Sequence, residues 1–261
     1  MLSGVLVRTA LALALFGIVW AGGSGASAQA QPETLREAMV GSAAEDGRER
    51  RHAPAAARYE SQSGADFVFD RSRRTALLKF SKGTEIWALT PTPGPRGDII
   101  YKNDLGQPVV RTTRLGGLTL FTREHPEGMP AAPVGPAQPF RPPVLTPQAL
   151  VQQLTKASGR ASRAAQRLIP FEAGVQGREV TPGSSFLVAD AASVAADAIT
   201  RLSATAPGRG AVSRVKKVRI LYGPRPTARI REGMLEIIIT PAHGMAGRPS
   251  SGLVIRTLAS R

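Results

Sequence analysis

A run of positive charge near the C-terminus is the part of this sequence best suited to binding chemistry. Between residues 201 and 231 the chain has nine basic residues and no acidic one: Arg201, Arg209, Arg214, Lys216, Lys217, Arg219, Arg225, Arg229 and Arg231. Arg offers planar donors that match phosphate and carboxylate groups, and Lys adds a compact charge. We therefore predict an anion-binding surface made of seven of these residues: Arg214, Lys216, Lys217, Arg219, Arg225, Arg229 and Arg231.

The distribution of charge along the chain supports this interpretation. The net charge is +15, and residues 29–128 hold 15 basic and 13 acidic residues, whereas residues 129–261 hold 18 basic and 6 acidic ones. A general bias toward Arg would not load one half of the chain in this way. The alternative is that the cluster is simply the solvated face of a basic protein, or a set of charges that guards an edge strand against aggregation.

A second candidate for chemistry is the pairing of a histidine with nearby serines. His243 precedes Gly247–Gly252, so a serine hydrolase that uses Ser250 or Ser251 as nucleophile is a hypothesis to weigh. The segment lacks the Gly-x-Ser-x-Gly pattern of a nucleophile elbow. Ser250 as the N-cap of a helix explains the segment more simply, and we assign no catalytic residue.

The sequence gives no sign of a metal site or a cofactor. It contains no cysteine, which excludes disulfides, thiolate ligands and a cysteine nucleophile. Its three histidines, His52, His125 and His243, share no metal-ligand spacing. We therefore expect neither a bound metal nor a cofactor.

Residues 1–28 have the pattern of a cleavable export signal. An apolar run, Ala10–Ala21, follows the single positive charge of Arg8. The small residues Ala26-Ser27-Ala28 place cleavage between Ala28 and Gln29, with Ala28-Gln29-Ala30 as the second choice. As a helix this run would span about 18 Å, against about 30 Å for the hydrocarbon core of a membrane. The rest of the chain has no comparable apolar stretch, so we expect no transmembrane span after cleavage. The predicted location is the periplasm or the cell envelope.

After a flexible lead-in at residues 29–57, residues 58–125 show the period-two pattern of a β-rich domain. Strand candidates separated by Gly, Pro, Asn and Asp cover residues 67–69, 77–80, 85–89, 98–101, 108–113 and 118–121. This order predicts an antiparallel meander, either a small barrel or a curled sheet. Residues 126–147 follow with eight prolines in 22 positions, and we interpret them as a semi-rigid Pro-rich linker that is poor at pairing with other strands.

Residues 148–261 are predicted to form a basic α+β domain, with helices on one face of an antiparallel sheet. One helix begins at Thr146-Pro147 and is interrupted at Gly159, and a stronger one carries an apolar stripe between residues 188 and 202 and stops at residues 206–208. Strands are predicted at residues 215–222 and 234–240, with Lys217 and Arg219 pointing away from the core. Ser250 is predicted to cap a last short helix, although a strand is an open alternative there.

Four short segments resemble an uncharacterised family of Gram-negative exported proteins that is known only as a domain of unknown function. The segments are Ile86–Leu89, Pro95–Asp104, Arg114–Phe121 and Gly247–Ser251. The resemblance covers most of residues 58–125 and 168–258. It implies export and two similar halves, and it implies no catalytic residue.

Together these patterns favour a non-enzymatic protein that contacts anionic lipid, lipopolysaccharide or wall polymer. Nucleic acid is a poor match, because Tyr222 is the one aromatic residue within the basic cluster and export removes the protein from most DNA and RNA. The alternative is an assembly or chaperone-like factor that binds another envelope protein through a sheet edge. A serine hydrolase ranks below both.

Overall fold

The structure, a computed structural model of the chain, describes residues 54–174 and 182–260. The predicted export signal, its cleavage point at Ala28 and Gln29, and most of the predicted lead-in lie outside the described residues. All described residues belong to one compact unit. Among them, no helix is both long enough and apolar enough to cross a membrane.

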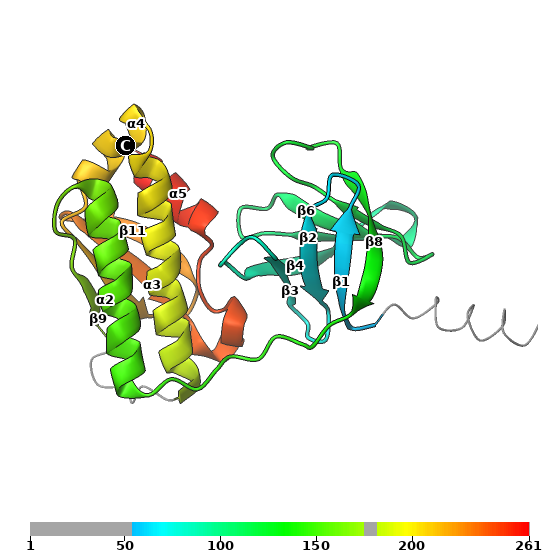
Figure 1. Cartoon of the computed structure of the whole chain (residues 1–261), viewed down its shortest axis with the longest axis horizontal. Helices are drawn as coiled ribbons and strands as arrows, with labels where there is room; N and C mark the ends of the chain where they lie inside the picture. The colour runs from blue at the N-terminus through cyan, green and yellow to red at the C-terminus, as the bar shows by residue number, and fades with distance from the viewer. Residues whose placement is uncertain (1–53, 175–181, 261) are drawn as a thin grey trace, which may run out of the picture. The chain divides into compact units, whose positions relative to one another are not determined.

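The first part of the described chain is a closed antiparallel barrel of eight strands (Figure 1). Its strands are β1 (Ala56–Ser61), β2 (Asp66–Asp70), β3 (Ala76–Phe80), β4 (Trp87–Pro93), β5 (Ile99–Lys102), β6 (Pro108–Thr112), β7 (Leu118–Leu120) and β8 (Met129–Pro136), with a 3-10 turn, η1 (Pro95–Gly97), between β4 and β5. Each strand pairs with the next in sequence, and β8 returns to pair with β1. Of the two predicted forms, the structure is the barrel.

Aromatic side chains fill the interior of the barrel. Phe67 and Phe69 are fully buried, because alternate residues of a strand point to the same side. The ring of Tyr59 stacks on Phe67 at 5.7 Å between centroids, and Tyr101 meets Phe69 edge-on at 5.0 Å. An eight-stranded barrel is just wide enough for its own side chains to fill it. The interior is therefore a packed core.

The prediction that the Pro-rich stretch is poor at strand pairing is wrong for its first half. Residues 129–136 form β8, which pairs with both β1 and β7 and closes the barrel. The fixed φ of proline is compatible with an extended strand, and each proline removes only a single donor from the ladder. A register shift between Arg58 and Tyr59 of β1 accompanies this pairing. The domain boundaries predicted around residues 126–147 stay a prediction.

The second part combines helices with a four-stranded sheet. Its elements are α2 (Pro147–Ala165), β9 (Phe171–Ala173), α3 (Pro182–Ser203), α4 (Ala206–Ser213), β10 (Lys217–Tyr222), β11 (Thr227–Arg231), β12 (Met234–Ile239), the 3-10 segment η2 (Pro241–Ala246) and α5 (Ser251–Ala259). The strand order in the sheet is β11-β12-β10-β9. Helices α2 and α3 lie side by side (Figure 1).

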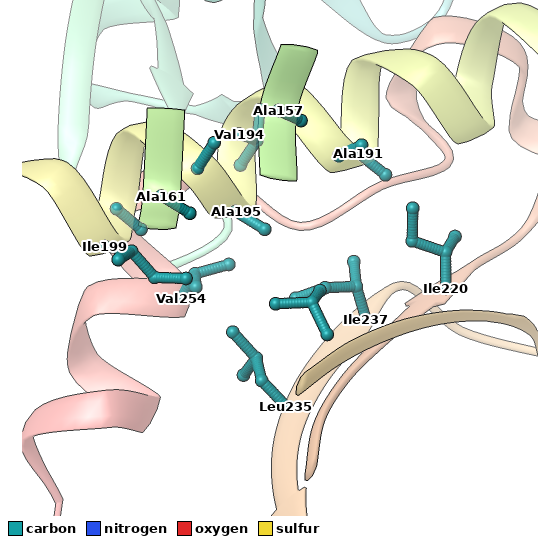
Figure 2. Packing of buried hydrophobic residues seen from close by; sticks show 14 of the residues in the cluster. Ala157, Ala161, Ala191, Val194, Ala195, Ile199, Ile220, Leu235, Ile237 and Val254 are labelled. Carbon is teal, nitrogen blue, oxygen red and sulfur yellow. The ribbon is translucent and has the colours of Figure 1, made fainter. Parts of the chain in front are cut away.

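Small side chains allow the helices to approach one another and the sheet. In Figure 2, alanines of α2 and α3, such as Ala157, Ala161 and Ala195, gather in the core that also takes Ile220 and Ile237 from the sheet. All five side chains are almost completely buried. The Ala-rich stripe of α3 thus has the role that its sequence predicts, which is close packing in an α+β core.

The predicted antiparallel sheet is a mixed one. Strand β10 runs parallel to both β12 and β9, and only β11 and β12 are antiparallel. The chain between β9 and β10 contains α3 and α4, and a helical crossover of this kind is what joins parallel neighbours. The sequence pattern did not predict two strands of this sheet, β9 and β11. Strand β9 has only three residues, and β11 carries two arginines, so neither stands out as a strand in the sequence.

Three helix predictions change in detail. Helix α2 passes through Gly159 to Ala165, because burial of Ala157 and Ala161 outweighs the cost of about 1 kcal/mol for a glycine inside a helix. Helix α3 ends at Ser203, just before the predicted stop, and residues 206–208 begin a further helix, α4, whose N-cap is Thr205. The last helix is confirmed: the Ser250 side chain accepts a hydrogen bond from the Leu253 amide, and the alternative of a strand is wrong.

The barrel core can be tested with one substitution at two leucines. Leu120 is 1% exposed inside the barrel, whereas Leu115, in the turn before β7, is 97% exposed. We expect Leu120→Ala to lower the free energy of unfolding by about 2–5 kcal/mol, because it leaves a cavity. The matched control Leu115→Ala is expected to change it by less than about 0.5 kcal/mol. Urea denaturation measures both, and equal effects would contradict a packed interior.

Candidate functional site

The predicted anion-binding residues lie mainly on the face of the C-terminal sheet that points away from the core. Val218 and Ile220 of β10 enter the core, so Lys217 and Arg219 point to the opposite side, as predicted. The same alternation places further charged or polar residues of the other strands there. We call this surface the polar face; it consists of Glu172, Lys217, Arg219, Thr227, Arg229, Arg231 and Glu236.

The register of the strands sets acidic residues between the basic ones. Arg229 is opposite Glu236, Glu236 is opposite Arg219, and Arg219 is opposite Glu172. This row crosses all four strands with alternating sign, and opposite charges that face each other across strands stabilise a sheet. The polar face therefore carries four basic and two acidic residues, a net charge of +2.

Glu172 neutralises much of the charge on β10. It accepts hydrogen bonds from Lys217 Nζ at 3.1 and 3.2 Å and from Arg219 Nη2 at 3.2 Å. These bonds, first from Lys217 and then from Arg219, lower the pKa of the Glu172 carboxyl. On β11, Arg229 Nε donates to Glu236, whose side chain is 11% exposed. Three of the seven predicted residues are thus paired with carboxylates.

Arg214 has a structural role. Its Nη2 donates to the Leu258 carbonyl at 2.5 Å and to the Ser260 carbonyl at 2.9 Å, at the C-terminal end of α5. The last carbonyls of a helix have no partner within the helix, and a guanidinium there satisfies them and opposes the negative end of the helix dipole. Arg214 therefore belongs to the scaffold of the sheet and α5.

Lys216, Arg225 and Arg231 are the predicted residues that remain available. All three are exposed, and within residues 54–174 and 182–260 their side chains make no hydrogen bond or ion pair. Lys216 precedes β10, Arg225 lies in the turn between β10 and β11, and Arg231 ends β11. We call these three residues the border cations: Arg231 is the last residue of β11 on the polar face, and Lys216 and Arg225 lie beyond the two ends of β10. They provide the unpaired positive charge of this part of the sheet.

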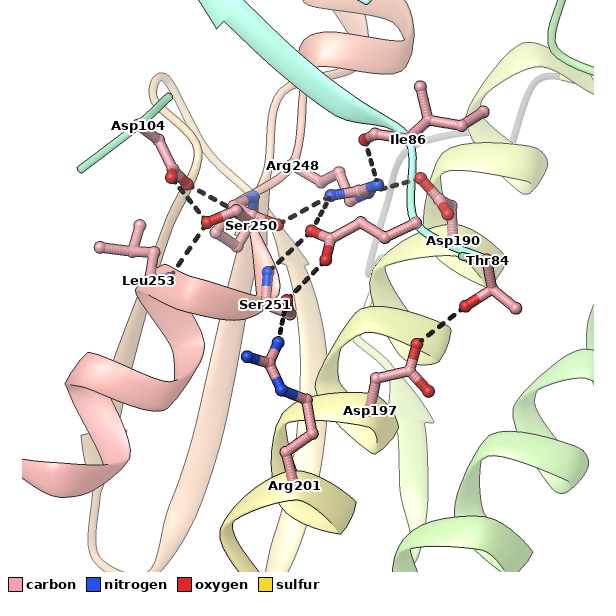
Figure 3. A network of polar contacts seen from close by, with 12 residues as sticks. Thr84, Ile86, Asp104, Asp190, Asp197, Arg201, Arg248, Ser250, Ser251 and Leu253 are labelled. Carbon is pink, nitrogen blue, oxygen red and sulfur yellow. Dashed lines mark hydrogen bonds and ion pairs between the residues drawn. The ribbon is translucent and has the colours of Figure 1, made fainter. Parts of the chain in front are cut away.

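A buried network around Arg248 is the most highly connected polar group in the described chain. No local pattern predicted that Arg248 would be buried or which carboxylates it would meet. The Arg248 side chain is only 3% exposed. Its guanidinium donates to Asp190 of α3, to Glu85 at 3.4 Å, and to the Ile86 carbonyl at 2.8 Å (Figure 3). Two carboxylates and one carbonyl thus surround one buried guanidinium, a geometry that arginine accommodates with its fork of donors.

Both serines after Arg248 donate to carboxylates. The Ser250 amide and hydroxyl donate to the two oxygens of Asp104, each at 2.6 Å. The Ser251 amide and hydroxyl donate to Glu85 at 2.9 and 2.5 Å, and Arg201 donates to the Ser251 hydroxyl at 3.1 Å (Figure 3). Glu85 and Asp104 come from the barrel and lie at the first turn of α5, where the helix dipole favours negative charge.

The hydrolase hypothesis receives no support from these contacts. Within the described residues, neither Ser250 nor Ser251 forms a hydrogen bond with His243. A nucleophilic serine needs its hydroxyl proton directed at a general base such as histidine. Here the hydroxyls donate to Asp104 and Glu85, and Ser250 caps α5. The described residues also contain no group of three side chains suited to hold a metal ion.

Segments that carry the resemblance meet in this network. Ile86 belongs to the first of them, Asp104 ends the second, and Arg248 to Ser251 form the last. A model for a domain of unknown function, DUF4908, matches residues 34–258. The chain belongs to this family. No curated protein matches the chain significantly, and no solved structure does so either.

The buried network can be tested by removing its cation. We expect Arg248→Met to lower the free energy of unfolding by about 3–5 kcal/mol, because Glu85 and Asp190 then remain buried without a counter-charge. Arg256→Met, at an exposed position of α5 with no side-chain partner among the described residues, is the matched control and should have little effect. Chemical denaturation measures both.

A triple variant separates loss of charge balance from loss of packing. Adding Glu85→Gln and Asp190→Asn to Arg248→Met removes the unpaired charges, so stability should recover in part. The opposite result would be a triple variant that is less stable than Arg248→Met by the separate costs of Glu85→Gln and Asp190→Asn added together. In that case the ionic account of the network is wrong.

Proposed function

We propose that the protein is an exported, non-enzymatic envelope protein that binds anionic envelope components through the basic border of its polar face. The observation that supports this most directly is the set of three exposed cations, Lys216, Arg225 and Arg231, which have no side-chain partner in the described part of the chain. Cations without an internal partner are free to pair with an external anion. The predicted export of the chain places lipid phosphates, lipopolysaccharide and acidic wall polymers within its reach.

Because of the acidic residues on the polar face, we expect each cation to bind an anion only weakly. Binding of a ligand should therefore depend on several contacts together. Glu172 and Glu236 already occupy Lys217, Arg219 and Arg229. A ligand must therefore rely on the border cations or compete with these carboxylates. Exposed charges act through a screened field, so the interaction should weaken with added salt.

A double neutralisation tests the border cations. We expect Lys216→Gln with Arg231→Gln to weaken binding to vesicles of phosphatidylglycerol and phosphatidylcholine by about 30-fold, since each cation near an anionic surface contributes about 1 kcal/mol. The control, Lys82→Gln with Arg96→Gln, removes two exposed charges from the barrel. Vesicle sedimentation measures both, and parallel assays with lipopolysaccharide and wall polymer identify the preferred anion. Equal losses in the two variants would mean that net charge, and not this surface, controls binding.

Glu172 provides a test in the opposite direction. We expect Glu172→Gln to strengthen binding about fivefold at neutral pH, because it frees Lys217 and Arg219. The wild-type protein should bind more tightly as the pH falls through the lowered pKa of Glu172, since protonation removes the same negative charge. That increase should be smaller in Glu172→Gln. Glu127→Gln, at an exposed barrel position, is the control, and the same vesicle assay at several pH values gives the answer.

A second candidate function is protein binding through strand β11. This strand lies at the edge of the sheet, so one side of its backbone has no neighbouring strand among those described. Edge strands can accept a strand from a partner through main-chain hydrogen bonds. Binding of this kind should survive high salt, whereas the proposed anion binding should not, and a salt titration of pull-downs from envelope extracts separates the two.

A further inference from the structure

A cavity of about 460 Å³ lies beside the Arg248 network. The turn before β3, the strand β4, the turn after β5, the turn after β10 and η2 line it, together with the segment that leads into α5. Its size falls in the range of about 300–1,000 Å³ that is typical of small-molecule sites. Ala88, Ala246 and Pro226 give it short apolar walls, while Arg74, His243 and Asp104 give it charged or titratable ones.

One part of the cavity lining carries a positive charge that forms no ion pair within the described chain. Arg74 is exposed in the turn between β2 and β3, and its guanidinium makes no hydrogen bond or ion pair with any residue in 54–174 or 182–260. The His243 ring and the Thr75 hydroxyl, which also line the cavity, have no side-chain hydrogen bond there either. Arg248 reaches the cavity as well, but Glu85 and Asp190 balance its charge.

Another part of the lining offers a negative charge. Asp104 accepts hydrogen bonds from the Ser250 amide and hydroxyl, both uncharged groups. No ion pair of Asp104 occurs within the described residues, although Arg74 lines the same cavity. Each carboxylate oxygen keeps acceptor capacity beyond its one bond to Ser250. The two opposite charges are therefore both present at the cavity and are not paired with each other.

We propose that this cavity binds a small zwitterion that carries a carboxylate and an ammonium group, such as a free amino acid or a short peptide. Arg74, with His243, receives the carboxylate, because a guanidinium binds a carboxylate through two parallel hydrogen bonds. Asp104 receives the ammonium, and Ser250 fixes the orientation of that carboxylate. The short walls made by Ala88, Ala246 and Pro226 favour small side chains. The polar face contributes none of these residues, so this site does not depend on the proposed anion binding.

The test uses the chain from Gln29 to Arg261, which lacks only the predicted export signal, and three forms of one dipeptide. Isothermal titration calorimetry measures the affinity of the protein for each form. The first is dialanine itself, the second is N-acetyl-dialanine, which lacks the ammonium, and the third is dialanine amide, which lacks the carboxylate. We expect dialanine to bind at least tenfold more tightly than either blocked form. Absent binding of dialanine, or equal binding of all three, would overturn the proposal.

Two substitutions assign each end of the ligand. In Arg74→Gln, the preference for dialanine over its amide should disappear; in Asp104→Asn, the preference over the acetylated form should disappear. Lys82→Gln, which removes an exposed barrel charge that does not line the cavity, should leave both preferences unchanged.

Because Asp104 also holds Ser250, thermal melting of Asp104→Asn is measured in parallel. Arg74→Gln removes no internal contact seen in the described chain, so it decides the matter even if Asp104→Asn is unstable. A preference that persists in Arg74→Gln would refute the assigned orientation.

Discussion

The burial of the Arg248 guanidinium is the constraint on which the rest of this structure depends. A charge that is 3% exposed is tolerated only when opposite charges and acceptors surround it, and Glu85, Asp190 and the Ile86 carbonyl do so. These partners come from the approach to β4 and from α3, which are far apart in the sequence. The hydrogen bonds of the Arg248 guanidinium thus hold three segments together. In the same network, Ser250 and Ser251 donate to carboxylates.

The polar face shows how strand register controls the strength of a basic surface. No acidic residue lies within residues 201–231, which hold nine cations, yet the sheet brings Glu172 and Glu236 into the same row as two of them. Arg214 is withdrawn separately, by the carbonyls at the end of α5. What remains for the proposed anion binding is a smaller set of border cations, and Glu172 competes with an external anion for Lys217 and Arg219.

The first turn of α5 links the network with the cavity beside it. Asp104 bonds to Ser250 on one side and lines the cavity on the other, so the same carboxylate has a structural partner and a free lone pair in reach of a ligand. Arg74 lines the cavity without any internal partner in the described chain. The proposed zwitterion site therefore uses an arrangement that the fold already requires for capping a helix, with one further cation from the barrel.

Local sequence patterns by themselves determined most of the element types: the alternating strands of the barrel, the Ala-rich stripe of α3, and the Ser250 cap of α5. These depend on neighbours within a few residues, which a pattern can record. Only the tertiary structure decided that residues 129–136 close the barrel, that the second sheet is mixed, and which carboxylates meet which cations. Several of these outcomes depend on contacts between residues far apart in the sequence, such as Lys217 with Glu172, 45 positions apart, and Arg248 with Glu85, 163 positions apart. No local period encodes such contacts.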